Sequence, residues 1–380
     1  MKPASVWHFC ASPVDPEAET GGVSNVVRAL ALESSRQGVK TTVVCGSHEL
    51  GQFKWAPGLR RHGAHLTTVT LPTDDVLGSF RQLRRIVAGM SSADAAHVHA
   101  GFSPFADGAM WLLRRRRLPY IYSPHGKLSE GMLRNRGRIK ALWWSAIGRA
   151  NGNGAALIGV AADGERDQFA RLELTAPTMT IPNGFTMTSA AGLDAAPLIA
   201  PPYLLFLGYL DPRKQPALLV KAFAASRARD TVRLALVGPD SYGHRTELEA
   251  LSQSLGLGDR VLFHGPAYGE DKWNILGHAL ALALPSLAEG MPLVLVEAAG
   301  AGIPSIFSTG SNGQILSQAG AGLEIQGDDP SAWAAALDLI VDDVARRTRM
   351  SLAAKDISAS LTWSEIGKRW MSVYSTLAGC

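Results

Sequence analysis

Short apolar runs alternate with helical patterns along most of the chain, which predicts strands and helices in turn. The runs are rich in Val, Ile, Leu and Ala and show little polar alternation, as is typical of strands buried on both faces. The predicted strands are residues 5–10, 39–45, 95–99, 119–123, 178–181, 203–208, 232–238, 261–265, 280–284 and 305–307. Helical spacing predicts helices over residues 23–37, 107–117, 215–226, 246–255 and 363–377. Because strands that alternate with helices form parallel sheets covered on both faces, the predicted fold class is α/β.

The alternation stops at the proline-rich segment 195–202 and then starts again. A chain of 380 residues is also too long for one ordinary core. We therefore expect two Rossmann-like domains, residues 1–198 and 199–362, that face each other across a cleft. Ligands would bind inside that cleft, at the carboxyl ends of the strands. Residues 363–380 form a separate, amphipathic C-terminal helix.

Composition narrows the class of protein only slightly. A hydrophobic fraction of 46% and a charged fraction of 18% are those of an ordinary globular protein. The net charge of +4 is compatible with an anionic ligand or an anionic membrane surface and does not require nucleic acid. Three cysteines are too few for a disulfide framework, and Cys10 and Cys45 end strand-like runs as buried thiols would. With no secretory signal and no apolar run long enough to span a bilayer, we expect a cytoplasmic protein.

Residues 289–297, EGMPLVLVE, place two carboxylates on either side of a predicted helix start. Pro292 fits the first helical position, where a missing amide hydrogen costs nothing. Glu289 would lie in the loop and Glu297 in the second helical turn. Between them the helix start offers free amide groups and the positive end of its dipole, which suit a phosphate. The alternative is one exposed loop glutamate and one glutamate on a helix face, because 33 acidic residues make any such spacing common.

Two other turns between a strand and a helix carry candidate phosphate ligands. In residues 208–214, GYLDPRK, Lys214 would neutralise the charge on a departing nucleoside diphosphate. The alternative is a solvated Arg–Lys pair in a turn. At the first such turn, the amides of Gly21 and Gly22 can face a phosphate. The alternative is a permissive turn before an ordinary helix.

Three histidines lie in or after predicted strands of the first half. His125 follows a buried strand, so it can hydrogen-bond a substrate in the cleft, or it can be a capped turn residue. His97 and His99 flank Val98 inside a buried strand, and we interpret both as structural.

These motifs together resemble family 4 of the retaining glycosyltransferases, which have the GT-B architecture of two Rossmann-like domains. The glutamate block is the specific part, and the resemblance covers nearly the whole chain. The helix that starts at Trp363 is similar to the one that crosses back to the first domain in that family. The segments that carry the resemblance occur in the family's order: Gly21–Gly22, His125, residues 182–185 (PNGF), 208–214, 289–297, 322–323 and 327–330.

The resemblance implies a role for each matching residue. Lys214 would bind the diphosphate, Glu297 the ribose hydroxyls and Glu289 the hydroxyls of the transferred sugar. His125 would lie near the reacting carbon, and Gly22 against the donor phosphate or the acceptor. The catalytic set is thus His125, Lys214 and Glu289, and the further groups that bind the nucleotide sugar are Gly208, Arg213, Gly290, Met291 and Leu293.

The family's chemistry implies neither a metal nor a cofactor, because the helix start and basic side chains do that work. Retention implies substitution on one face of the sugar, with the leaving phosphate oxygen taking the acceptor proton. Glu289 would then not be the nucleophile that retaining hydrolases use. The chain departs from the family at Tyr209, where an arginine is usual, and this loss of a cation affects turnover more than fold. Pro292 also removes one amide from the loop that contacts the sugar.

A basic stretch in the first domain precedes a pair of tryptophans. It suits an anionic membrane face, and the alternative is a solvated helix beside core tryptophans. Its members are Arg114, Arg115, Arg116, Arg117, Arg134, Arg136, Arg138, Lys140, Trp143 and Trp144.

We therefore predict a retaining, metal-independent glycosyltransferase that moves a sugar from a nucleoside-diphosphate sugar to a glycan or lipid-linked acceptor. Its role would be in polysaccharide or glycoconjugate synthesis, at the inner membrane surface and without nucleic acid. Two alternatives stay open. One is a catalytically impaired partner that binds sugar nucleotides, and the other is a nucleotide-sugar epimerase or phosphorylase with the same fold. The sequence leaves the nucleobase, the sugar and the acceptor open.

Overall fold

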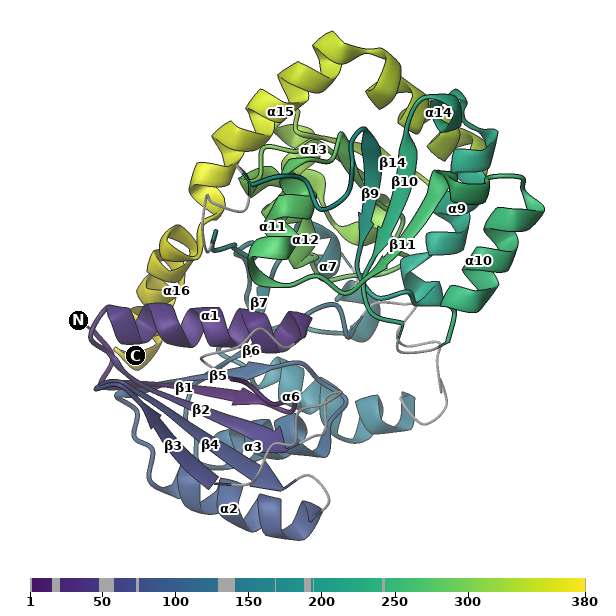
Figure 1. The fold of residues 1–380 in the computed structure, drawn as a ribbon. Helices are drawn as coiled ribbons and strands as arrows, with labels where there is room; N and C mark the ends of the chain where they lie inside the picture. Colours follow the sequence, from purple (N-terminus) through teal and green to yellow (C-terminus); the bar gives the residue numbers. More distant parts are fainter. Residues whose placement is uncertain are drawn as a thin grey trace. The chain divides into compact units, whose positions relative to one another are not determined.

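The chain folds into two compact α/β units, residues 1–183 with 363–380, and residues 184–362. Figure 1 shows the sheet and the helices of each unit. The computed structural model describes residues 2–15, 21–47, 58–72, 75–128, 141–167, 169–187, 193, 195–240 and 243–379. The predicted α/β class with two parallel-sheet units is confirmed.

The first unit contains an eight-stranded sheet of order β3-β4-β2-β1-β5-β6-β7-β8. All neighbouring strands are parallel except β3 and β4. The strands are β1 (Ser5–Cys10), β2 (Lys40–Ser47), β3 (Gly58–His62), β4 (Leu66–Pro72), β5 (Asp94–His99), β6 (Tyr120–Ser123), β7 (Leu157–Val160) and β8 (Thr178–Thr180). The helices are α1 (Gly22–Arg36), α2 (Val76–Ala88), α3 (Pro104–Arg115), the π-helix η1 (Trp144–Gly148), α6 (Arg149–Asn153), α7 (Asp163–Arg166), η2 (Ala170–Leu172) and α16 (Trp363–Ala378).

The second unit contains a six-stranded parallel sheet of order β11-β10-β9-β12-β13-β14. Its strands are β9 (Tyr203–Leu207), β10 (Arg233–Val237), β11 (Val261–Gly265), β12 (Ala281–Leu284), β13 (Ser305–Ser308) and β14 (Gly322–Ile325). Its α-helices are α9 (Pro216–Ala225), α10 (Arg245–Ser254), α11 (Gly269–Gly277), α12 (Leu293–Gly300), α13 (Gln314–Gln318), α14 (Pro330–Asp342) and α15 (Val344–Ser358). Single 3₁₀ turns are η3 (Pro212–Lys214), η4 (Arg227–Asp230), η5 (Gly258–Arg260), η6 (Thr309–Ser311) and η7 (Ala359–Leu361).

Both sheets reverse their strand order at one point. The chain builds outward from β1 to β4 and then returns to place β5 on the other side of β1. In the second unit it builds from β9 to β11 and then places β12 beside β9. In open parallel sheets, ligands bind outside the carboxyl ends of the strands at such a reversal. The reversal between β9 and β12 is therefore where a ligand of the second unit is expected.

The C-terminal helix α16 packs on the first unit, against α1 and β5 (Figure 1). The ring of Trp370 lies 4.7 Å from the ring of His97, and a Cβ atom placed on Gly159 would lie 2.4 Å from Trp370. The expectation that the last helix returns to the first domain is confirmed.

The division between the units falls at Gly184, whereas the proline pattern predicted it at residue 198. The reason is Asn274 on α11, which anchors the intervening segment to the second unit. Its side-chain carbonyl accepts from the amide of Leu198 at 2.9 Å, and its side-chain NH₂ donates to the carbonyl of Ala196 at 3.1 Å.

Within the described residues, no helix is both long enough and apolar enough to cross a bilayer. Cys10 and Cys45 are buried free thiols, as predicted, and Cys380 lies outside the described residues. Gly38, at φ 75°, directly follows the C-cap residue of α1.

We expect Trp370→Ala to lower the free energy of unfolding of the first unit by about 3–5 kcal/mol, because it empties a buried aromatic site. Lys368→Ala, on the exposed face of the same helix, is the matched control and should change it by less than about 0.5 kcal/mol. Guanidinium unfolding followed by circular dichroism measures both. Equal, small effects would show that α16 does not stabilise the first unit.

Candidate functional site

The reversal point of the second sheet is bridged by an ion pair. Lys214 lies at the end of the turn that follows β9, and Glu289 lies in the loop that follows β12. The ammonium of Lys214 donates to Oε1 of Glu289, although the two residues are 75 positions apart. Their side chains are 24% and 19% exposed, so an incoming anion can still reach the lysine. The structure thus brings together two of the three predicted catalytic residues.

The turn that carries Lys214 is held against the end of β10. The amide of Gly208 donates to the carbonyl of Val237 at 2.9 Å, and the amide of Leu210 donates to the carbonyl of Pro239 at 3.0 Å. Gly238 has φ 150°, and a Cβ atom there would lie 1.9 Å from the carbonyl oxygen of Gly208. Only glycine allows this approach of two backbones.

Arg213 is directed at Asp211 in this structure. Its Nε lies 3.0 and 3.1 Å from the two carboxylate oxygens, and its amide donates to Oδ1 at 2.8 Å. Burial opposes ionisation of Asp211, but the hydrogen bonds from Arg213 outweigh it and lower the pKa of that carboxyl. The guanidinium therefore stabilises the turn, and its predicted contact with the nucleotide stays a prediction. Tyr209, where the family has arginine, is 40% exposed.

The loop that carries Glu289 is held by the turn after β13. The amide of Glu289 donates to the carbonyl of Gly310 at 2.8 Å, and the side chain of Asn312 donates to the carbonyl of Glu289 at 2.7 Å. A Cβ atom on Gly310 would lie 2.2 Å from the carbonyl oxygen of Leu287, so the two loops touch through their backbones. The carboxylate thus extends from a loop whose main chain is fixed.

Helix α12 begins at Leu293, and Pro292 is its N-cap residue with ψ 132°. The prediction that Pro292 occupies the first helical position was wrong by one residue. Its φ of −62° suits either position, and the extended ψ makes it the cap. No side chain caps this helix and its first turn has no acidic residue. Within the described residues, the amides of Gly290 and Leu293 donate no hydrogen bond, so the helix start can accept an anion.

Glu297 lies one turn further along α12 and pairs with a residue that the sequence patterns missed. The ammonium of Lys272, on α11, donates to its Oε1 at 2.8 Å. The two side chains are only 10% and 15% exposed. The sequence did offer a signal for Lys272: it lies next to Trp273 in the mostly apolar stretch 272–276, and a lysine buried there needs an acidic partner. The pair orients the carboxylate that was predicted to bind ribose.

His125 and Gly22 belong to the first unit. His125 has a left-handed backbone, at φ 51°, and its Nε2 lies 3.0 Å from Nδ1 of His99. The next amide, that of Gly126, donates to Glu165, which fixes this turn. Gly22 is the first residue of α1, and a Cβ atom there would meet no described atom within 4 Å. Packing among the described residues therefore does not require glycine at this position.

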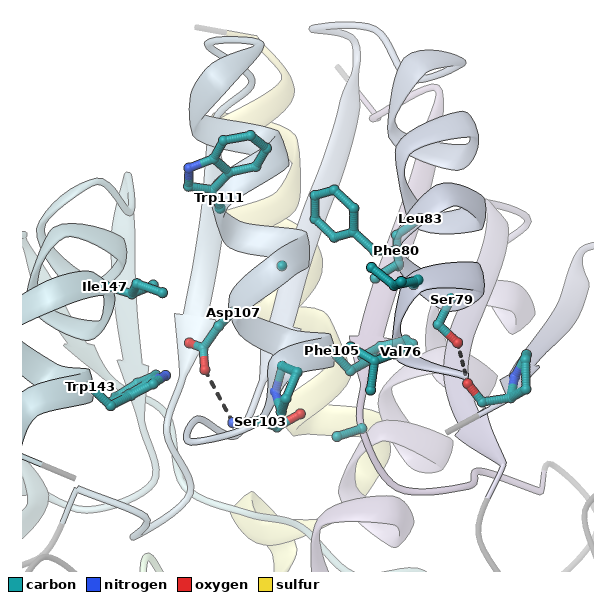
Figure 2. Close-up of a pocket in the computed structure, with 15 residues that line it drawn as sticks. Val76, Ser79, Phe80, Leu83, Ser103, Phe105, Asp107, Trp111, Trp143 and Ile147 are labelled. Carbon is teal, nitrogen blue, oxygen red and sulfur yellow. Dashed lines mark hydrogen bonds between the residues drawn. The ribbon is translucent and has the colours of Figure 1, made fainter. Parts of the chain in front are cut away.

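The first unit also has a cavity of about 670 Å³ between α2, α3 and η1 (Figure 2). Its lining is almost entirely apolar, and Leu77 at its edge is 72% exposed. Among the described residues of the lining, Asp107 is the only acidic group; its burial raises the pKa of the carboxyl to about 7, although the Ser103 amide donates to it at 3.1 Å. The residues labelled in Figure 2 are Val76, Ser79, Phe80, Leu83, Ser103, Phe105, Asp107, Trp111, Trp143 and Ile147.

The predicted basic stretch is only partly described. Arg114 donates to Asn151 at 3.0 Å, Arg116 donates to the carbonyl of Val87, and Arg115 lies over the ring of Trp111 at 5.2 Å. Two of these arginines are thus engaged in structural hydrogen bonds. Arg134, Arg136, Arg138 and Lys140 lie outside the described residues.

Two α/β units, each built on a largely parallel sheet, with a C-terminal helix on the first and paired lysines and glutamates in the second, define a GT-B type of protein. The model for "Glycosyl transferase 4-like domain" matches residues 21–184, and that for "Glycosyl transferases group 1" matches residues 197–357. The chain therefore belongs to the family 4 glycosyltransferases of GT-B fold.

Curated relatives include two D-inositol 3-phosphate glycosyltransferases. That of Kineococcus radiotolerans is 29% identical over 94% of this chain and 90% of its own length. That of Salinispora tropica is 31% identical over 44% of this chain and 37% of its own length, so this match spans well under half of the relative.

Solved structures share the fold at low identity. Sucrose-phosphate synthase from Thermosynechococcus elongatus superposes with a TM-score of 0.78 at 21% identity, over 99% of each chain. Anabaena HepE in complex with UDP and glucose superposes with a TM-score of 0.72 at 18% identity, over 98% of this chain and 100% of its own.

We expect Gly238→Ala to destabilise the second unit by more than about 1 kcal/mol, because its new Cβ atom would collide with the carbonyl of Gly208. Gly208→Ala is the matched variant, since its Cβ atom would meet only the Phe206 ring, at 3.9 Å. It should change stability by less than about 1 kcal/mol. Thermal unfolding of the two variants tests this contrast, and equal stability would contradict the close approach of the two turns.

Proposed function

We propose that this protein is a retaining glycosyltransferase that moves a sugar from a nucleoside-diphosphate sugar to a lipid-linked glycan. The observation that carries the proposal is the Lys214–Glu289 pair at the reversal point of the second sheet, next to the uncapped start of α12. A cation, free amides and a carboxylate are the groups that a diphosphate joined to a sugar requires.

Each part of the donor, the diphosphate, the sugar and the ribose, would contact a different group of this site. The diphosphate would contact Lys214 and the amides of Gly290 and Leu293, where the helix dipole favours negative charge. The sugar hydroxyls would contact Glu289, and the ribose hydroxyls would contact Glu297. HepE, which shares this fold, is described as a complex with UDP and glucose, and this supports a ligand of the same class here.

The chemistry that we propose uses this chain's own charges. In the transition state, negative charge grows on the leaving phosphate, and Lys214 would neutralise it. Glu289 would orient the sugar hydroxyls and would not attack the reacting carbon, unlike the nucleophile of retaining hydrolases. The leaving phosphate oxygen would take the acceptor proton on the same face, which retains the configuration. Because the lysine and the amides supply the positive charge, we propose that transfer needs no metal.

The acceptor is proposed to carry a lipid. The apolar cavity of the first unit suits a hydrocarbon chain, and its exposed rim includes Leu77, Val76 and Ile147. Exposed apolar groups beside arginines are typical of proteins that rest on an anionic membrane. A role in polysaccharide or glycoconjugate synthesis at the inner membrane surface would follow. The second candidate is a small phosphorylated polyol acceptor, which the names of the curated relatives favour.

Lys214→Ala should weaken nucleoside-diphosphate binding about 10- to 100-fold, because a charge-assisted hydrogen bond is lost. Glu289→Gln should leave binding within about threefold or tighten it, since Lys214 is freed, while transfer falls about 100-fold. Calorimetry and a transfer assay on the purified chain measure the two effects. Lys221→Ala, exposed on α9, is the control.

Unchanged affinity of Lys214→Ala for the nucleoside diphosphate would contradict the proposed donor site. Binding without turnover in the unmodified protein would favour the catalytically impaired partner, and epimerised donor or phosphate-dependent release of sugar phosphate would favour the other alternative.

Leu77→Glu and Ile147→Glu should lower transfer to a polyprenyl-linked acceptor about tenfold, because each places a charge where a hydrocarbon chain would lie. Donor hydrolysis should stay within about twofold. Leu352→Glu, at a leucine that is 58% exposed on α15, is the matched control. Full transfer to the lipid-linked acceptor in both cavity variants would favour the small phosphorylated acceptor.

A further inference from the structure

Three imidazoles are buried side by side in the first unit. His8 on β1 is in register with His97 on β5, and His99 follows two residues later on the same face. None of the three side chains is exposed. They lie at the reversal point of this sheet, between β1 and β5.

One hydrogen bond lies within this cluster, and a second joins it to His125. Nδ1 of His8 lies 3.0 Å from Nε2 of His99, and Nδ1 of His99 lies 3.0 Å from Nε2 of His125. His8, His99 and His125 thus form a line of imidazoles, which we name the histidine line. It runs from the interior of the sheet to the partly exposed turn after β6.

Each imidazole of the histidine line is neutral near pH 7. Burial lowers the pKa of His8 to about 3 and that of His125 to about 4, and it holds that of His99 well below its usual value. A neutral imidazole has one N–H donor and one acceptor nitrogen. The direction of one hydrogen bond therefore sets the direction of the next, and only two arrangements of the whole line exist.

The two arrangements differ in what they leave buried at the inner end. Nε2 of His8 has no partner among the described residues. If His125 donated to His99, and His99 to His8, the proton of His8 would lie on that nitrogen as a buried, unpaired donor. In the opposite direction, the unpaired nitrogen is only an acceptor. Buried unpaired donors are the rarer case, so the line is expected to donate from His8 toward His125.

We propose that His99 and His8 are positioning residues that hold His125 as the tautomer with its proton on Nδ1. Nε2 of His125 then accepts from His99, and Nδ1–H is left to donate. No described residue binds that nitrogen. The use of this donor rests on the proposed function, in which a sugar or acceptor oxygen would receive it.

The same residues could be considered as metal ligands, since one nitrogen each of His8, His97 and His99 lie within 4.8 Å of one another. However, both nitrogens of His97 already have partners, Tyr374 at 2.9 Å and Ser123 at 2.8 Å. His8 and His99 also bond directly to each other. A metal ion would have to break these contacts, so the hydrogen-bonded line is the arrangement that the geometry favours.

The tautomer can be read directly by ¹⁵N spectroscopy of histidine-labelled protein without substrate, with His125→Asn to assign the signals. We expect a protonated Nδ1 and an unprotonated Nε2 on His125. A proton on Nε2, or a stoichiometric metal ion with metal-shifted ring nitrogens, would overturn the proposal. This measurement does not depend on transfer activity. The proposed tautomer can therefore be contradicted while the proposed function stands, and the proposed function can be contradicted while the tautomer is confirmed.

Two variants of His99 separate positioning from packing. In His99→Asn the side-chain amide replaces Nδ1 and can still donate to His125, so kcat should stay within about threefold. In His99→Gln the amide replaces Nε2 and leaves His125 without its partner, so kcat should fall about tenfold with KM unchanged. The His125 spectrum should change only in His99→Gln.

His97→Asn is the control, because it disturbs the same buried face outside the histidine line. Its His125 spectrum should match that of the unmodified protein. Equal losses of kcat in His99→Asn and His99→Gln, with unchanged spectra, would show a packing role and contradict positioning.

Discussion

The ion pair between Lys214 and Glu289 is the interaction on which the donor site depends. It joins the loops after β9 and β12, the two strands between which the sheet reverses its order. Backbone contacts from Gly238 and Gly310 hold both loops from outside. The pair therefore holds an ammonium and a carboxylate side by side, and a diphosphate can take over the lysine while the carboxylate turns to the sugar.

The reversal point of the first sheet holds neutral side chains in place of charged ones. This point, between β1 and β5, is filled by buried imidazoles rather than by an ion pair. Burial keeps them uncharged, so they can pass on the direction of a hydrogen bond but cannot neutralise an anion. α16 closes this face, because Tyr374 and Trp370 both contact His97. The C-terminal helix thus contributes to the surroundings of His125 as well as to the stability of the unit.

Local patterns predicted many of the elements that are apolar and regular, but they missed the strands β4 and β7 and the apolar helix α14. The first strand was predicted with its observed ends, Ser5–Cys10, and the last helix was predicted to within one residue. β3 was missed because it is almost wholly exposed and carries Arg60 and Arg61, and α2 because its exposed arginines hide its narrow apolar stripe. The family resemblance assigned Lys214 and Glu289 to one donor site, and their direct ion pair was not predicted. Lys272 and His8 were missed because each acts through a distant residue, and no local pattern reveals such a contact.

A crystal structure of the chain soaked with a nucleoside diphosphate would show where the anion binds. We expect phosphate oxygens within hydrogen-bonding distance of the Lys214 ammonium and of the amides at the start of α12, with Glu297 on the ribose. A diphosphate bound elsewhere, with the Lys214–Glu289 pair unchanged, would rule out this donor site.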